Sequence, residues 1–201
     1  MMKLPKTFLR GSIPPLITPF RNGRVDYDAY AGLVEFQVRN GSHGILVNGT
    51  TSEPASLTVE ERNRVVDVAI EACAGKLPIV AATGSQNLHE TSALTEHAEK
   101  AGADAILIVT PYYTRPPQRG LVEYYKKLGK QTSLPWMIYH IPGRAAVSVS
   151  LDTLDKISKA CPNFVGMKHA VDDLGFASEC LDHFGMDFRI FVGLEDLSYP
   201  M

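Results

Sequence analysis

A lysine stands inside a short apolar run of this sequence. Lys168 lies within residues 164–170 (FVGMKHA), which have the length and composition of a buried strand. Lysine is seldom buried without a partner, because removing an ammonium from water is costly. Burial lowers the pKa of the amine, and a neutral amine can attack a ketone, lose water and form an electron-withdrawing iminium. The simpler alternative is a lysine that reaches solvent or pairs with a carboxylate.

Groups able to assist this chemistry stand at the ends of other apolar runs. Tyr139 lies at the end of the expected strand next to the one that carries Lys168, and Thr50 and Thr51 follow Gly49 in a turn. Their hydroxyl groups could move protons, and the backbone N–H groups of the glycine-led turn could hold a carboxylate. Each residue also has a structural interpretation, Tyr139 as a core aromatic and the threonines as caps of the turn.

Two loops add further candidates. Tyr112 and Tyr113 stand in a proline-rich loop (TPYYTRPPQ), where they could join the site or pack at an interface. Arg144 follows in the segment YHIPGR. A guanidinium there could bind a substrate carboxylate through two hydrogen bonds, or it could pair with a neighbouring Asp or Glu.

Seven short apolar runs alternate with helix-like stretches and indicate a parallel α/β protein. The runs begin about 24 to 34 residues apart and cover residues 12–18, 44–49, 78–84, 105–110, 135–141, 164–170 and 188–193. Between them, Thr58 and Glu61 predict a capping box for a helix with Val65, Val66, Ala69 and Ile70 on its buried face. Gly102 marks the end of another helix.

Two architectures fit this alternation, a doubly wound sheet and a TIM (β/α)8 barrel. The sequence contains no GxGxxG or GxxxxGK[ST] phosphate turn, and polar residues gather at strand ends, as in a barrel. A barrel needs eight strands, and seven are predicted. We therefore expect residues 1–201 to form a single barrel domain truncated after strand seven. Because open sheet edges are a liability in water, either the sequence is a fragment, or another chain or an irregular closure covers the gap.

Four motifs, in this order along the chain, resemble the dihydrodipicolinate synthase / N-acetylneuraminate lyase family. They are Gly49-Thr50-Thr51-Ser52-Glu53, Thr110-Pro111-Tyr112-Tyr113 with Arg115-Pro116, Tyr139-His140-Ile141-Pro142-Gly143-Arg144, and Gly166-Met167-Lys168. That family consists of TIM barrels that act as class I, pyruvate-dependent lyases and aldolases. Its members are longer, so the resemblance implies that strand eight and the C-terminal helices are missing from these residues.

The resemblance assigns roles to the catalytic candidates. It implies that Lys168 forms an imine with pyruvate, that Tyr139 transfers the proton and that Thr50 relays it. It also implies that Tyr113 completes the relay from a neighbouring subunit, and hence a homodimer or homotetramer. No cofactor is expected beyond the covalent imine on Lys168.

The resemblance also implies a substrate. Thr51 corresponds to the residue that holds the pyruvate carboxylate, in the turn that Gly49 begins, and Arg144 to the arginine that binds the carboxylate of L-aspartate 4-semialdehyde. The expected reaction condenses pyruvate with that aldehyde, as in lysine biosynthesis. The alternatives are a related aldolase, lyase or dehydratase acting on a sugar-derived 2-keto acid, and a catalytically inactive fragment or binding module.

The sequence departs from the family's pattern in four places: Ser52 for glycine, His140 for asparagine, His169 for an acidic residue, and residues 192–197 (VGLEDL) for the usual turn after strand seven. These departures leave the identity of the aldehyde open. Side chains alternate along a strand, so His140 and His169 should face away from Tyr139 and Lys168 and should have a structural role.

Composition excludes several other classes of protein. The 20 basic and 22 acidic residues give a net charge of −2, which predicts neither nucleic-acid nor membrane-surface binding. Three cysteines without CxxC spacing, and an N-terminus without an apolar signal segment, predict reduced thiols in a cytoplasmic protein. No apolar run is long enough to span a bilayer. The histidines lack metal-ligand spacing, so no metal is expected.

Overall fold

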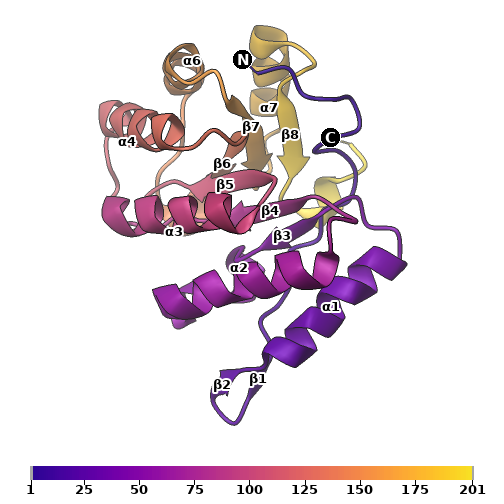
Figure 1. Cartoon of the computed structure of the whole chain (residues 1–201). Helices are drawn as coiled ribbons and strands as arrows, with labels where there is room; N and C mark the ends of the chain where they lie inside the picture. Colours follow the sequence, from indigo (N-terminus) through magenta and orange to yellow (C-terminus); the bar gives the residue numbers. More distant parts are fainter. Residues whose placement is uncertain (1, 201) are drawn as a thin grey trace. The chain divides into compact units, whose positions relative to one another are not determined.

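The computed structural model describes residues 2–200, in which strands and helices alternate (Figure 1). The strands are β1 Phe20–Arg21, β2 Arg24–Val25, β3 Ile45–Val47, β4 Ile79–Ala82, β5 Ala105–Val109, β6 Trp136–His140, β7 Phe164–His169 and β8 Arg189–Val192. The α-helices are α1 Tyr27–Arg39, α2 Val59–Cys73, α3 Leu88–Ala101, α4 Gln118–Gln131, α5 Pro142–Ala145, α6 Leu151–Ala160 and α7 Leu174–Phe184. No α-helix of the described residues is long and apolar enough to cross a membrane.

Six strands form a parallel sheet in the order β3-β4-β5-β6-β7-β8, so neighbours in the sheet are neighbours in the sequence. This order, with helices between the strands, is that of a TIM barrel truncated before closure, as the sequence predicts. The chain divides into two compact units. One comprises residues 6–83 and 93–106, and is called the N-terminal unit below. The other, called the C-terminal unit, comprises residues 2–5, 84–92 and 107–200.

Helix α2 of the N-terminal unit begins with the predicted capping box. The Thr58 hydroxyl accepts a hydrogen bond from the Glu61 amide at 3.1 Å, and the Glu61 carboxylate accepts one from the Thr58 amide at 2.9 Å. Such a cap satisfies two amides that the first turn of a helix leaves without partners. Val65, Val66 and Ala69 are buried, as predicted for the inner face of the helix, whereas Ile70 is only half-buried.

The first predicted strand, residues 12–18, is wrong. Only an isolated bridge between Pro15 and Leu46 forms there, supported by hydrogen bonds from the Leu46 amide to the Pro14 carbonyl at 3.0 Å and from the Leu16 amide to the Leu46 carbonyl at 3.1 Å. Two consecutive prolines offer no N–H groups, so the ladder of a regular strand cannot form at these positions.

The core of the C-terminal unit is aromatic. Trp136 of β6 stacks on Tyr125 of α4 with ring centroids 5.7 Å apart, and it contacts Phe164 of β7 at 4.8 Å. The Trp136 indole donates a hydrogen bond to the Asn163 amide oxygen at 3.2 Å. All three rings are fully buried, so they hold the starts of β6 and β7 together beneath α4.

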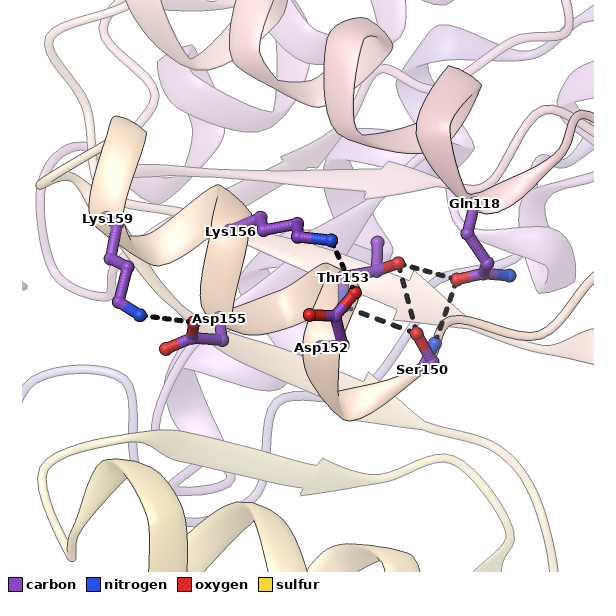
Figure 2. A network of polar contacts seen from close by, with 7 residues as sticks. All are labelled: Gln118, Ser150, Asp152, Thr153, Asp155, Lys156 and Lys159. Atoms are coloured by element: carbon purple, nitrogen blue, oxygen red, sulfur yellow. Dashed lines mark hydrogen bonds and ion pairs between the residues drawn. The ribbon is translucent and has the colours of Figure 1, made fainter.

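A polar network in the same unit fixes the loop between α5 and α6 (Figure 2). Gln118, at the start of α4, donates to the Ser148 carbonyl at 2.7 Å and accepts from the Ser150 amide at 3.1 Å and the Thr153 hydroxyl at 2.7 Å. Ser150 is also the N-cap of α6, since its hydroxyl accepts from the Thr153 amide at 3.2 Å. One glutamine therefore ties the loop that follows Arg144 to the first turns of two helices.

Candidate functional site

The pairing of β6 with β7 brings Tyr139 beside Lys168. The two residues are register partners, and the Lys168 amine lies 4.6 Å from the centroid of the Tyr139 ring. This is the distance of a cation–π contact, in which the face of the ring attracts an ammonium. The prediction that Tyr139 lies at the end of the strand next to the lysine strand is confirmed.

A register shift in the ladder produces this alignment. Trp136 pairs with Phe164, but Met137 pairs with Gly166, so Val165 is an extra residue in β7. Without that extra residue, Tyr139 would pair with Met167 instead of Lys168. Irregularities of this kind re-aim side chains and are common beside active sites.

Gly166 allows β8 to approach β7 closely. A Cβ atom at this position would collide with the Arg189 carbonyl oxygen on β8, so no larger residue fits without backbone movement. Gly166 pairs with Arg189, and Lys168 with Phe191. The lysine is thus held between two neighbouring strands near the carboxyl end of β7, where TIM-barrel sites form.

Lys168 is half-buried, and burial lowers the pKa of its amine from the model-compound value of 10.5. Within residues 2–200 no carboxylate lies within ion-pair distance of this amine. The alternative in which Lys168 pairs with a carboxylate is therefore wrong for the described part of the chain. An amine that is partly dehydrated and lacks a counter-ion loses its proton more readily than an ordinary lysine.

His140 and His169 lie on the opposite face of the same strands. They are register partners one step beyond Tyr139 and Lys168, both are buried, and their Nδ1 atoms are 3.2 Å apart. Burial first, and then the neighbouring His169, lowers the pKa of His140 from 6.5 to about 4, and burial lowers that of His169. The expected orientation is confirmed, but the direct contact between the two rings was not predicted.

Tyr113, in a loop, and Arg144, in a short helix, are exposed residues of the C-terminal unit. Tyr113 follows β5 with 89% of its surface exposed and a left-handed backbone (φ 69°), and Arg144 lies in the short helix α5. Within residues 2–200 neither side chain makes a hydrogen bond or an ion pair. The alternative in which Arg144 pairs with a nearby acid is not found there.

The N-terminal unit holds the other predicted residues together. Gly49 is the N-cap of a 3-10 helix over Thr50–Ser52, and Thr50 and Thr51 are exposed. The buried Ser52 anchors the turn, because its hydroxyl donates to the Leu16 carbonyl at 2.6 Å and its own carbonyl accepts from the Thr18 hydroxyl at 2.8 Å. Ser52, which stands where the family usually has glycine, therefore holds the turn in place through these two hydrogen bonds.

The structure thus groups Lys168 with Tyr139 in one unit, and Gly49 with Thr50 and Thr51 in the other. Among residues 2–200 no three His, Cys, Asp or Glu side chains are placed to hold a metal ion. A parallel sheet in barrel order, with helices between its strands, defines a TIM-barrel-type protein, and the half-buried Lys168 near the carboxyl end of β7 marks the candidate site.

Comparison with known proteins identifies the family. The profile of the dihydrodipicolinate synthetase family matches residues 8–201, and the chain belongs to that family. The 4-hydroxy-tetrahydrodipicolinate synthase of Thermus thermophilus is 45% identical over 193 residues, which are 96% of this chain and 64% of that protein. The chain therefore spans just under two thirds of the length of this relative.

Solved structures agree with the sequence comparison. The crystal structure of dihydrodipicolinate synthase from Aquifex aeolicus superposes with a TM-score of 0.93 at 42% identity, covering 94% of this chain and 65% of that one. The chloride-inhibited enzyme from Acinetobacter baumannii, complexed with pyruvate, gives 0.91 at 34% identity, covering 96% and 66%. At this similarity the fold of the chain is that of the family.

The lowered pKa of His140 predicts an acid-sensitive stability. Between pH 6.5 and about 4 the unfolded chain takes up a proton at this residue while the folded protein does not, so the free energy of unfolding should fall as the pH drops through this window. The loss should be on the order of 3 kcal/mol. Urea unfolding at a series of pH values measures it.

The His140→Asn variant cannot take up this proton and should lose that part of the pH dependence. His89→Asn is the matched control, because His89 is exposed and its side chain makes no ion pair within residues 2–200. An unchanged slope of stability against pH in His140→Asn would contradict the assignment.

Proposed function

We propose that the protein is a Schiff-base-forming lyase that condenses pyruvate with an aldehyde, and that the aldehyde is L-aspartate 4-semialdehyde. This is the 4-hydroxy-tetrahydrodipicolinate synthase reaction of lysine biosynthesis. The observation that carries the proposal is the Lys168 amine, half-buried 4.6 Å from the Tyr139 ring centroid, with its pKa lowered by burial. The names of the relatives and the neighbour solved with pyruvate support the choice of substrates.

The chemistry begins at the neutral Lys168 amine, which attacks the carbonyl carbon of pyruvate. The resulting carbinolamine hydroxyl is protonated and leaves as water, so a carbon–nitrogen double bond replaces the carbonyl. The positive iminium then makes the methyl carbon acidic, and loss of one proton gives an enamine that attacks the aldehyde carbon. Tyr139 is the proposed proton carrier, because its side chain and that of Lys168 meet on one face of the strands.

Thr50 and Tyr113 are the proposed remaining members of the proton relay. In this proposal Tyr113 acts from a second copy of the chain, which makes the active form a homodimer or homotetramer. The conformation of Tyr113 supports the role of a second copy. Its left-handed backbone costs energy, and its exposed phenol makes no hydrogen bond or ion pair within residues 2–200 that would offset this cost.

The proposed carboxylate sites are the turn of Gly49 and Thr51 for pyruvate, and Arg144 for the aldehyde. Within residues 2–200 the Thr51 amide has no acceptor, as is usual in the first turn of a helix, and such amides favour anions. The guanidinium of Arg144 can bind a carboxylate through two hydrogen bonds. No cofactor takes part beyond the covalent imine, and the cytoplasm is the proposed compartment, in keeping with three buried, reduced cysteines.

Borohydride trapping tests the imine. Pyruvate and borohydride added to the complete gene product should leave one covalent adduct, with the mass of pyruvate less one water plus two hydrogens. Intact-mass and peptide mass spectrometry should place it on Lys168, because burial lowers the pKa of this amine. Lys168→Ala should abolish the adduct, whereas Lys127→Ala, which alters an exposed lysine, should leave it unchanged. An adduct that persists in Lys168→Ala would defeat the proposal.

A panel of aldehydes tests the second substrate. Arg144→Ala should raise KM for an aldehyde that bears a carboxylate by about tenfold to a hundredfold, through the loss of charge-assisted hydrogen bonds. The rate of pyruvate trapping should not change. Arg119→Ala, at an exposed arginine of α4, is the control. Equal effects on aldehydes with and without a carboxylate would instead favour the related aldolase that acts on a sugar-derived keto acid.

A further inference from the structure

Three hydrogen bonds form a continuous chain through the two buried histidines. The Val149 amide donates to Nε2 of His140 at 3.3 Å, the Nδ1 atoms of His140 and His169 are 3.2 Å apart, and Nε2 of His169 lies 3.1 Å from the Asp173 carbonyl oxygen. The Phe176 ring contacts both imidazoles, with centroids 5.6 and 5.7 Å away. The two histidines of this cluster lie on the face of β6 and β7 opposite to Tyr139 and Lys168.

The hydrogen-bond partners at the two ends of this chain of hydrogen bonds determine which nitrogen of each imidazole carries a proton. A backbone amide only donates, so Nε2 of His140 must be unprotonated and the ring proton must be on Nδ1. That proton is donated to Nδ1 of His169, which must therefore be an acceptor. His169 then carries its proton on Nε2 and donates it to the Asp173 carbonyl, which only accepts. A single arrangement of protons, with both rings neutral, satisfies all three bonds.

The two ends of this chain of hydrogen bonds lie in the loop between α5 and α6 and in the loop between β7 and α7. Val149 belongs to the loop that follows Arg144, and Gln118 forms hydrogen bonds with its neighbours Ser148 and Ser150, the second of which Figure 2 shows. Asp173 is the N-cap of α7, and its carboxylate accepts from the Phe176 amide at 2.9 Å. The backbone joins the same elements, because the Ala170 amide donates to the His140 carbonyl at 2.9 Å.

We propose that His140 and His169 act as positioning residues. Through their contacts with Val149 and Asp173, they hold the loop that follows Arg144 (residues 146–150) in place relative to β7, which carries Lys168. This role rests on the proposed function, because it concerns the spacing between the arginine that binds the aldehyde and the lysine that forms the imine. Neither histidine touches substrate. The pair acts on the binding of the second substrate and leaves imine formation with pyruvate unchanged.

The proton arrangement is tested first, in the unaltered protein. With ¹⁵N-labelled histidine at neutral pH, NMR should show both rings neutral, the proton on Nδ1 in His140 and on Nε2 in His169, and a scalar coupling between the two Nδ1 nuclei across their hydrogen bond. A charged ring, or the opposite tautomer at either residue, would overturn the proposal. This measurement does not depend on any activity.

The positioning role is tested by two substitutions at His140 in the complete gene product. Gln can place its amide oxygen near the position of Nε2 and keep the acceptor for the Val149 amide, whereas Asn is too short to do so. His140→Asn should raise KM for the carboxylate-bearing aldehyde by about tenfold, the factor expected for one lost buried hydrogen bond. His140→Gln should restore most of this loss, and both variants should trap pyruvate at the unaltered rate.

The outcomes separate the two proposals. If the unaltered protein traps no pyruvate, the proposed function fails, and the tautomers still report on the histidine pair. If pyruvate is trapped but Asn and Gln have the same KM, or both lower trapping and aldehyde binding equally, the positioning role is overturned. His183→Asn and His183→Gln are matched controls at an exposed histidine and should change neither quantity.

Discussion

The register between β6 and β7 is the constraint on which the candidate site depends. An extra residue at Val165 shifts the ladder by one position, so that Tyr139 pairs with Lys168 and His140 with His169. Because side chains alternate along a strand, Tyr139 and Lys168 then share one face of the two strands, and His140 and His169 share the other. Gly166, which admits the backbone of β8, keeps β7 in place beside this irregularity.

The partial burial of Lys168 in the candidate site lowers the stability of the folded protein. A half-buried amine without a carboxylate partner loses hydration, and this lowers its pKa. The face of the Tyr139 ring attracts the ammonium and offsets part of the cost, by about 0.5 to 2 kcal/mol for such contacts. A carboxylate partner would stabilise the charged form more strongly, and it would leave less of the neutral amine that the proposed mechanism needs.

Much of the fold could be predicted from the sequence, because local patterns specify it. Six of the seven apolar runs form strands of the sheet, and the box at Thr58 and Glu61 caps α2 as expected. Gly102 follows α3 with a positive φ of 102°, as a residue that ends a helix should. The failure at Pro14 and Pro15 is local too, since an apolar composition does not supply the N–H groups that a strand needs.

The contacts across strands were harder to predict. The alternation of side chains along a strand indicates which faces His140 and His169 occupy. Their direct hydrogen bond, however, depends on the shifted register, and no residue type predicts an extra residue in a parallel strand. The anchoring role of Ser52 likewise depends on the Leu16 carbonyl, 36 positions away in the sequence. The neighbourhood of Lys168 and Tyr139 was predicted because both residues end adjacent strands, and the order of the strands follows the sequence.

The ionisation of Lys168 is the most direct test of the central claim that this amine is held partly dry and ready to lose its proton. An NMR titration of the protein with labelled lysine side chains, assigned by comparison with a Lys168→Met variant, measures it. The account predicts that the Lys168 amine titrates below 10.5, the value for an unperturbed lysine. A midpoint at or above that value would show a well-hydrated or ion-paired ammonium, and would contradict the account.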